Sequence, residues 1–228
     1  MDERRWEQVA AATGIAFVVV LLIGTFIVDQ PPDVDGPARE IRRYFLDNQN
    51  GLLFQAWLFG LAGVLFIWFA GTLRSRLAVA EGEGRRLSLI SFAGAIGTLA
   101  TLVPTVALNA TLAYTVARGA PPVLTHALFE LSFWFGVLVV FSLAVFVGAA
   151  SLSAGRTGAL PQWLAWGGLA VAALHLLQSV DLFVRNTDFF EPNGVIGYVN
   201  LVLILLWILA ASVLMLQSVR GTARSRNR

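Results

Sequence analysis

Neither cysteine nor lysine occurs among the 228 residues, and charged residues of any kind are scarce. The lack of cysteine excludes disulfides, thiolate metal ligation, iron–sulfur clusters and cysteine nucleophiles. The lack of lysine excludes Schiff-base catalysis, and all sixteen basic residues are arginine. Charged residues make up only 13% of the chain, whereas their share in soluble domains is about a quarter. This composition excludes an ordinary soluble domain.

Hydrophobic sequence is in excess, at 57% of residues with a mean hydropathy of +0.73. Apolar segments recur at or above the ~20 residues that a helix needs to cross the hydrocarbon core of a bilayer. They are residues 9–28, 51–73, 87–116, 123–152, 163–184 and 195–217. We predict an all-α integral membrane protein, a six-transmembrane-helix bundle that forms one domain over residues 1–228. The basic tail, residues 218–228, is expected to be disordered.

The arginines are distributed unevenly between the two ends of such a bundle. With six spans, eleven arginines lie on the side of both termini and five on the opposite side. Because basic loops stay in the cytoplasm, both termini are predicted to be cytoplasmic, in the inner membrane of a bacterium. The formal net charge is only +2, and the arginines flank the membrane, so no nucleic-acid partner is expected.

A short amphipathic helix is predicted in the first outer loop. Gly36 and Pro37 resemble a helix start, since proline is tolerated in a first turn. After them Ile41, Tyr44 and Phe45 share one face, and arginines occupy the others. That pattern is typical of a helix that lies in the plane of the membrane interface.

Polar side chains inside the apolar segments are the candidate site, because ionisable groups in lipid-spanning helices are costly. Under the predicted orientation they all fall in the outer half of the bilayer or near its middle. They are His126, Glu130, His175, Gln178, Asp181, Asn109, Gln55 and Asn200. The inner half offers only small residues, serine and threonine, whereas a continuous pore would carry polar groups throughout. We therefore expect an outward-facing pocket with an apolar floor, between segments 123–152 and 163–184.

The two histidines suggest a more specific arrangement. His126 and Glu130 are four residues apart and share a helix face, as do His175 and Gln178. A short loop joins their two segments, which favours antiparallel neighbours. A ladder of histidines and carboxylates across that helix pair is geometrically plausible, with Asp181 at its outer end.

Several kinds of chemistry remain compatible with these residues. They can be hydrogen-bond links between helices, worth about 0.6–2 kcal/mol each. Glu130 and His126 could form a proton relay in a transporter. Two histidines could ligate haem, although His175 is expected about 6–9 Å deeper than His126. A zinc hydrolase would need three protein ligands and an open position, and no zinc signature is present.

Four segments carry a recurring pattern, namely EIRRYFLDN (40–48), LFGLAGVLFIWF (58–69), LRSRL (73–77) and LPQWLAWGG (160–168). In them the chain resembles a group of small multipass membrane proteins of high-GC bacteria that are classed as a domain of unknown function. The resemblance covers most of the chain and implies the multipass class and topology. It implies no activity for any residue.

The sequence favours a non-enzymatic function without a cofactor. We expect the outward pocket to bind or sense a small or lipidic ligand, with membrane lipids as neighbours. A homo-oligomer or a partner membrane subunit is compatible with the same sequence. A proton-coupled transporter is the first alternative, and a haem- or metal-binding redox protein or hydrolase is the second.

Overall fold

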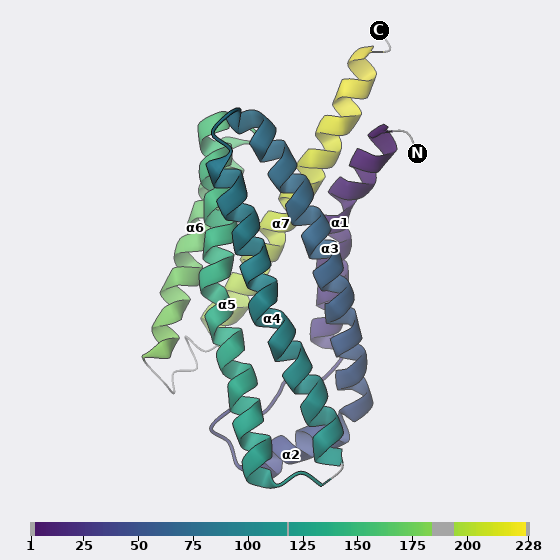
Figure 1. The fold of residues 1–228 in the computed structure, drawn as a ribbon, viewed down its shortest axis with the longest axis vertical. Helices are drawn as coiled ribbons and strands as arrows, with labels where there is room; N and C mark the ends of the chain where they lie inside the picture. Colours follow the sequence, from purple (N-terminus) through teal and green to yellow (C-terminus); the bar gives the residue numbers. More distant parts are fainter. Residues whose placement is uncertain (1–2, 118, 184–193, 227–228) are drawn as a thin grey trace.

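The structure is a computed structural model that describes residues 3–117, 119–183 and 194–226. The described residues form only helices, seven α-helices and one 3-10 helix (Figure 1). They are α1 (Glu3–Phe26), α2 (Ala38–Asp47), α3 (Gln49–Glu81), α4 (Arg86–Ala117), α5 (Pro122–Thr157), α6 (Gln162–Gln178), η1 (Ser179–Leu182) and α7 (Val195–Arg226). The all-α prediction is confirmed.

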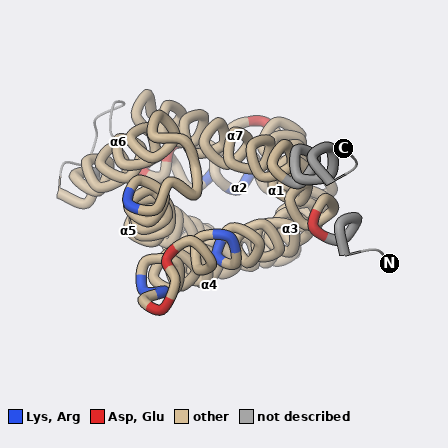
Figure 2. Tube along the Cα trace, turned by 90° about the horizontal axis from the view of Figure 1, so that it is seen from above, with Lys and Arg blue, Asp and Glu red and all other residues tan. Residues whose placement is uncertain are grey.

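The long helices are arranged as a ring. Viewed along the bundle, they follow one another in the order α1, α3, α4, α5, α6 and α7, and α7 closes the ring against α1 (Figure 2). The start of α1, the end of α7, and the α3–α4 and α5–α6 connections lie together at what we term the terminal end (Figure 1). The opposite, or α2, end carries α2, which contacts α3, α4 and α5.

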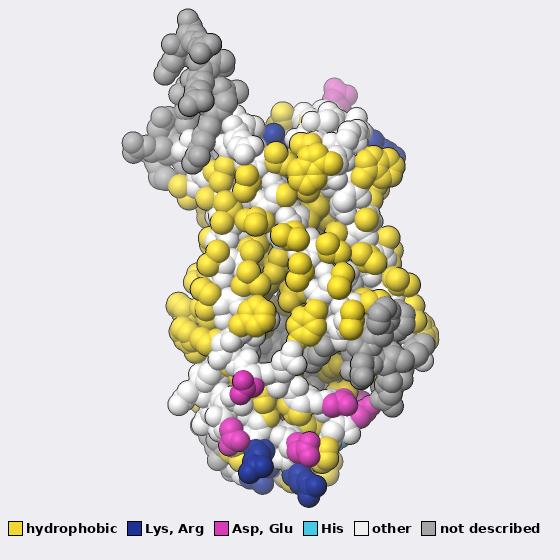
Figure 3. Space-filling model, turned by 180° about the vertical axis from the view of Figure 1, so that it is seen from behind, with side chains coloured by type: hydrophobic (Ala, Val, Ile, Leu, Met, Phe, Trp, Pro, Cys, Tyr) yellow, Lys and Arg dark blue, Asp and Glu magenta, His cyan; other side chains and the backbone are white. Residues whose placement is uncertain are grey.

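Apolar side chains cover the outside of this ring. Among the described residues, five helices are long and apolar enough to cross a membrane: α1, α3, α4, α5 and α7. Figure 3 shows a band of hydrophobic side chains around the middle of one face, with acidic side chains and arginines below it. Large apolar residues such as Val64, Val202 and Leu206 are more than half exposed. Such an exterior suits a multipass membrane protein.

The helix boundaries differ from the predicted segments at several places, including the ends of α3, α6 and α7. α6 ends at Gln178 and a 3-10 turn follows, so it has 17 residues and is shorter than the predicted segment 163–184. α3 continues past residue 73 to Glu81, so the predicted basic loop is reduced to a tight turn beginning at Gly82, whose φ is +69°. α7 continues to Arg226, so residues 218–226 of the tail that was predicted to be disordered are part of a helix, and residues 227–228 lie outside the described residues. Hydropathy marks where lipid contact ends, but the backbone hydrogen bonds of a helix continue into water.

The short helix α2 is present where the sequence predicted it, but its apolar face is used differently. Ile41 and Phe45 are fully buried, at 0% and 1% exposure, rather than facing lipid. They pack in a cluster with Leu112 and Val116 of α4 and with Phe129 of α5. The Phe45 and Phe129 rings meet edge to face, with centroids 5.8 Å apart. α2 therefore plugs the ring at its end.

The helices approach one another most closely toward the terminal end. Gly94 of α4 lies against the backbone of Phe146 on α5, and Ser91 donates a 2.9 Å hydrogen bond to the Phe146 carbonyl. The carboxylate of Glu81 accepts hydrogen bonds from the Ser88 backbone N–H at 2.8 Å and the Ser153 hydroxyl at 2.5 Å. These contacts join α3, α4 and α5, which fixes that half of the bundle.

The close approach of α4 and α5 predicts a specific sensitivity to side-chain volume. A Cβ at Gly94 would lie 2.5 Å from the Phe146 backbone nitrogen and 2.8 Å from its Cα, which cannot move independently. We expect Gly94→Ala to lower the unfolding free energy in detergent by about 1–3 kcal/mol through overpacking. Gly60→Ala is the control, because nothing lies within 4 Å of its Cβ position. Equal thermal unfolding temperatures for the two variants would contradict this packing.

Candidate functional site

A cavity of about 590 Å³ lies inside the ring toward the α2 end. All six helices of the ring contribute to its wall, and so do α2 and the loop between α1 and α2. Its volume falls in the range of pockets that hold small ligands. At this cavity the side chains of the described residues do not fill the interior of the ring.

Three buried polar side chains of the cavity wall come from α6 and α7. His175, Gln178 and Asn200 are only 2%, 7% and 2% exposed. The Asn200 amide donates to Oε1 of Gln178 at 2.7 Å and to the Leu174 carbonyl at 3.2 Å. These bonds connect α7 to α6 within the wall.

Two acceptor atoms of this wall, on His175 and Asn200, take no part in these hydrogen bonds. A carbonyl can only accept, so Nδ1 of His175, 2.9 Å from the Val171 carbonyl, carries a proton. The neutral ring then has Nε2 as its acceptor. The Leu174 carbonyl also can only accept, so the nitrogen of the Asn200 amide, and not its oxygen, points toward it. Oδ1 of Asn200 is then buried without a hydrogen-bond partner among the described residues. An unsatisfied buried acceptor costs about 1–3 kcal/mol.

Two further polar pairs lie in the opposite wall. The Ser132 hydroxyl of α5 donates to Oδ1 of Asn109 on α4 at 3.1 Å. The Gln55 amide of α3 donates to the Gly24 carbonyl of α1 at 2.8 Å. Each pair joins neighbouring helices of the ring.

The α1–α2 loop, residues 27–37, forms part of the cavity wall and is held at three points. The Gln30 amide donates to the Tyr198 hydroxyl of α7. The Tyr44 hydroxyl of α2 donates to the Asp29 carbonyl at 3.1 Å, and Nε2 of His126 donates to the Val34 carbonyl at 2.9 Å. Burial, with a smaller effect of the Asp29 charge, raises the pKa of Tyr44 to about 12. Tyr44 therefore stays a neutral hydrogen-bond donor at physiological pH.

Apolar side chains line much of the rest of the wall. On α5 the lining residues recur at helical spacing and end with Leu143, the one nearest the terminal end. Leu201 and Ile204 are the corresponding residues on α7. Phe59, Phe129 and Phe133 add aromatic surface from two helices. The cavity thus combines polar groups with apolar and aromatic surface.

The structure separates the predicted site residues into two groups. Those that line the cavity are Gln55, Asn109, His175, Gln178 and Asn200. His126 binds the α1–α2 loop instead, and Glu130 accepts a 3.5 Å hydrogen bond from Trp134. Asp181 belongs to η1, but its side chain lies outside what the structure describes.

The predicted ladder of histidines and carboxylates is not formed by the described side chains. No hydrogen bond among them joins His126 or Glu130 to His175 or Gln178. Phe129 lines the cavity, and Glu130, the next residue, points about 100° away around the helix. His126 and Glu130 do share a face of α5, but another face of α5 lines the cavity. The pocket is enclosed by the whole ring rather than by two helices.

Residues of the loop and of α7 were missed by the sequence reasoning. Asp29 and Asp33 line the cavity from the loop, and Tyr198 does so from the first turns of α7. A loop between apolar segments is ordinarily polar, so its sequence alone carries no signal. Tyr198, two residues before Asn200, was detectable as a polar group in an apolar segment.

The described histidines and carboxylates are not clustered as metal ligands. Within the described residues, no group of three or more histidines, cysteines, aspartates or glutamates is placed to hold a metal ion. Both histidines are hydrogen-bonded to backbone carbonyls, on α6 and in the α1–α2 loop respectively.

The Asn200–Gln178 hydrogen bond predicts coupling between these two positions. Asn200→Leu and Gln178→Leu should each lower the unfolding free energy by about 1–3 kcal/mol, because each leaves a buried partner unsatisfied. The double variant should lose less than the sum, with a coupling of about 0.5–3 kcal/mol. Chemical unfolding in detergent measures all three. Asn200→Leu combined with Ser91→Ala, at the terminal end, should be additive, and additivity in both pairs would contradict the described bond.

No family model, no curated protein and no solved structure matches the chain. The resemblance to small multipass proteins of high-GC bacteria remains a prediction, and the functional argument rests on the described residues.

Proposed function

We propose that the protein binds a small or lipidic ligand in the cavity, as a membrane protein that crosses the bilayer six times. The observation that carries the proposal is Asn200, a residue that lines a cavity large enough for a ligand and whose buried Oδ1 has no hydrogen-bond partner among the described residues. A ligand that brings a hydrogen-bond donor beside Asn200 and His175 would satisfy acceptors that the protein leaves open. A purely structural core has no use for such groups, since apolar side chains would fill the space without this cost.

A sixth span is consistent with the length of α6. Its 17 residues extend about 26 Å, and the four residues of η1 add about 8 Å. Together they match the hydrocarbon thickness of about 30 Å. The start of α1 and the end of α7 at one end of the bundle also fit an even number of crossings (Figure 1). The arginine bias supports a cytoplasmic position for that end.

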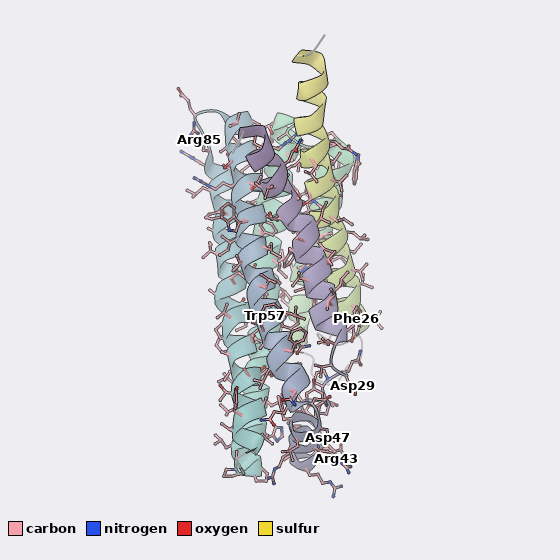
Figure 4. The ribbon with its side chains drawn as sticks, turned by 90° about the vertical axis from the view of Figure 1, so that its right-hand side faces the viewer. Phe26, Asp29, Arg43, Asp47, Trp57 and Arg85 are labelled. Atoms are coloured by element: carbon pink, nitrogen blue, oxygen red, sulfur yellow. The ribbon has the colours of Figure 1, made fainter. Side chains whose placement is uncertain are left out.

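The proposed membrane boundary places the cavity near the outer interface. Figure 4 shows Phe26 and Trp57 at a similar height, with Asp29, Asp47 and Arg43 beyond them toward the α2 end. Trp57 is 62% exposed, as expected for an aromatic side chain at the edge of the hydrocarbon region. α5 has 36 residues and, at about 54 Å, projects beyond the bilayer. A ligand with an apolar part and a polar head suits this position.

Binding is favoured over transport by the apolar end of the cavity. Leu143, Leu201 and Ile204 line its deepest part, and the close packing of α4 on α5 follows toward the terminal end. A proton relay through His126 and Glu130 is not supported, because neither residue is among those that line the cavity.

The orientation is testable by labelling, because the chain has no native cysteine. Asp47 and Glu83 are exposed residues at the α2 end and in the α3–α4 turn. In intact cells, Asp47→Cys should react with a membrane-impermeant maleimide, whereas Glu83→Cys should react only after permeabilisation. The opposite result would reverse the orientation, and reaction of both in intact cells would overturn the topology.

Ligand binding is testable by filling the cavity. Gly136 lines it, and nothing lies within 4 Å of a Cβ built there. We expect protein in phosphatidylcholine nanodiscs to bind one dodecyl amphiphile, measured by native mass spectrometry. Gly136→Leu should weaken binding about tenfold or more, a loss of about 1.4 kcal/mol.

Gly60→Leu is the matched control, because its Cβ position is also open and Gly60 does not line the cavity. It should bind as the wild type does. If dodecanol, dodecylamine, dodecyltrimethylammonium and laurate all fail to bind, the proposed function is wrong. Equal binding by both leucine variants would assign the site to another surface.

A further inference from the structure

We propose that the cavity selects amphiphiles whose head is a protonated amine. This inference rests on the proposed function and adds the chemical class of the ligand. It follows from three properties of the described wall: the sign of its charges, the kind of hydrogen-bonding group left open, and its aromatic surface.

The charged groups of the cavity wall are acidic. Among the described residues that line it, the formally charged side chains are Asp29 and Asp33, and no arginine is included. Both carboxylates belong to the α1–α2 loop, and Figure 4 shows Asp29 toward the α2 end, which we propose faces the outer interface. Charges of one sign around a cleft raise the local concentration of ligands of the opposite sign. A cationic head is therefore favoured, and a carboxylate or phosphate head is repelled.

The open hydrogen-bonding groups of the deep wall are acceptors. Nε2 of neutral His175 and Oδ1 of Asn200 lie on adjacent helices, α6 and α7. The His175 hydrogen bond is made by Nδ1, and Oδ1 of Asn200 is buried without a partner among the described residues. A primary ammonium has three N–H donors and no acceptor, which matches both groups. A quaternary ammonium carries the charge but lacks these donors, so it should bind less well.

Aromatic side chains add a third preference for a cation. Phe59, Phe129, Phe133 and the two tyrosines Tyr44 and Tyr198 line the same cavity. Their ring faces attract ammonium groups in a desolvated site. A neutral alcohol has the donor needed for Asn200 but gains nothing from the rings or the carboxylates.

The test compares amphiphiles that have the same dodecyl tail and different head groups. Dodecylamine, dodecyltrimethylammonium, dodecanol and laurate are titrated against the protein in phosphatidylcholine nanodiscs, with empty nanodiscs correcting for partition into lipid. Dodecylamine is expected to bind about tenfold more tightly than dodecanol, and laurate least well. Dodecanol or laurate binding as tightly as dodecylamine would overturn the cationic preference. Equal binding of dodecyltrimethylammonium would overturn the role of the two acceptors.

A charge-neutral variant tests the carboxylates directly. Asp29→Asn combined with Asp33→Asn should reduce dodecylamine binding to about the level of dodecanol. Dodecanol binding should stay unchanged, which shows that the cavity is intact. Asp47→Asn is the control, because Asp47 lies at the same end, pairs with Arg43 at 3.9 Å and does not line the cavity. Unchanged dodecylamine binding in the double variant would overturn the proposal.

The results separate this inference from the function on which it rests. Tight dodecanol binding that is lost in Gly136→Leu keeps the cavity as a ligand site and rejects only the amine preference. Failure of every probe to bind rejects both.

Discussion

The packing of α4 against α5 at one end of the ring, and of α2 against both at the other end, shapes the rest of the structure. Toward the terminal end Gly94 lets α4 contact the backbone of α5, and a continuous apolar core includes Leu77 and Met215. At the α2 end Ile41 and Phe45 of α2 pack with residues of both α4 and α5. The cavity lies between the tightly packed part and this plug. A closed ring with such a plug encloses space between its helices.

The exterior of the ring explains why the polar side chains gather inside it. A helix that faces lipid has no water to satisfy polar groups, so they point toward other helices or toward a cavity. This rule allowed the all-helical class and the long apolar helices to be predicted from hydropathy, whereas several helix ends differ from the predicted segments. Gln55, Asn109, His175, Gln178 and Asn200 were identified as candidates for this reason, before their contacts were known.

Rotation about the helix axis is what the sequence could not determine. Glu130 and Phe129 are adjacent in sequence, yet Phe129 lines the cavity and Glu130 lies with Trp134. The position of a residue along the helix axis follows from counting residues, but the direction in which its side chain points depends on which neighbours the helix has. The closing contact of α7 with α1 joins segments at opposite ends of the chain, and no local pattern encodes it. The role of His126, which holds the α1–α2 loop, depends on the same long-range arrangement.

The buried amides in the cavity wall formed by α6 and α7 bear most directly on function. Leucine at positions 178 and 200 would remove an unsatisfied acceptor and add apolar packing, so the amides are not the most stable solution for an unoccupied core. Buried polar networks stabilise only when every member is satisfied, and Oδ1 of Asn200 is not. The missing donor has to come from outside the described side chains, and the adjoining cavity is the route by which it can reach Asn200. Within the cavity wall, the acceptors deep on α6 and α7 and the carboxylates of the α1–α2 loop both favour the same partner, a cation that carries N–H groups.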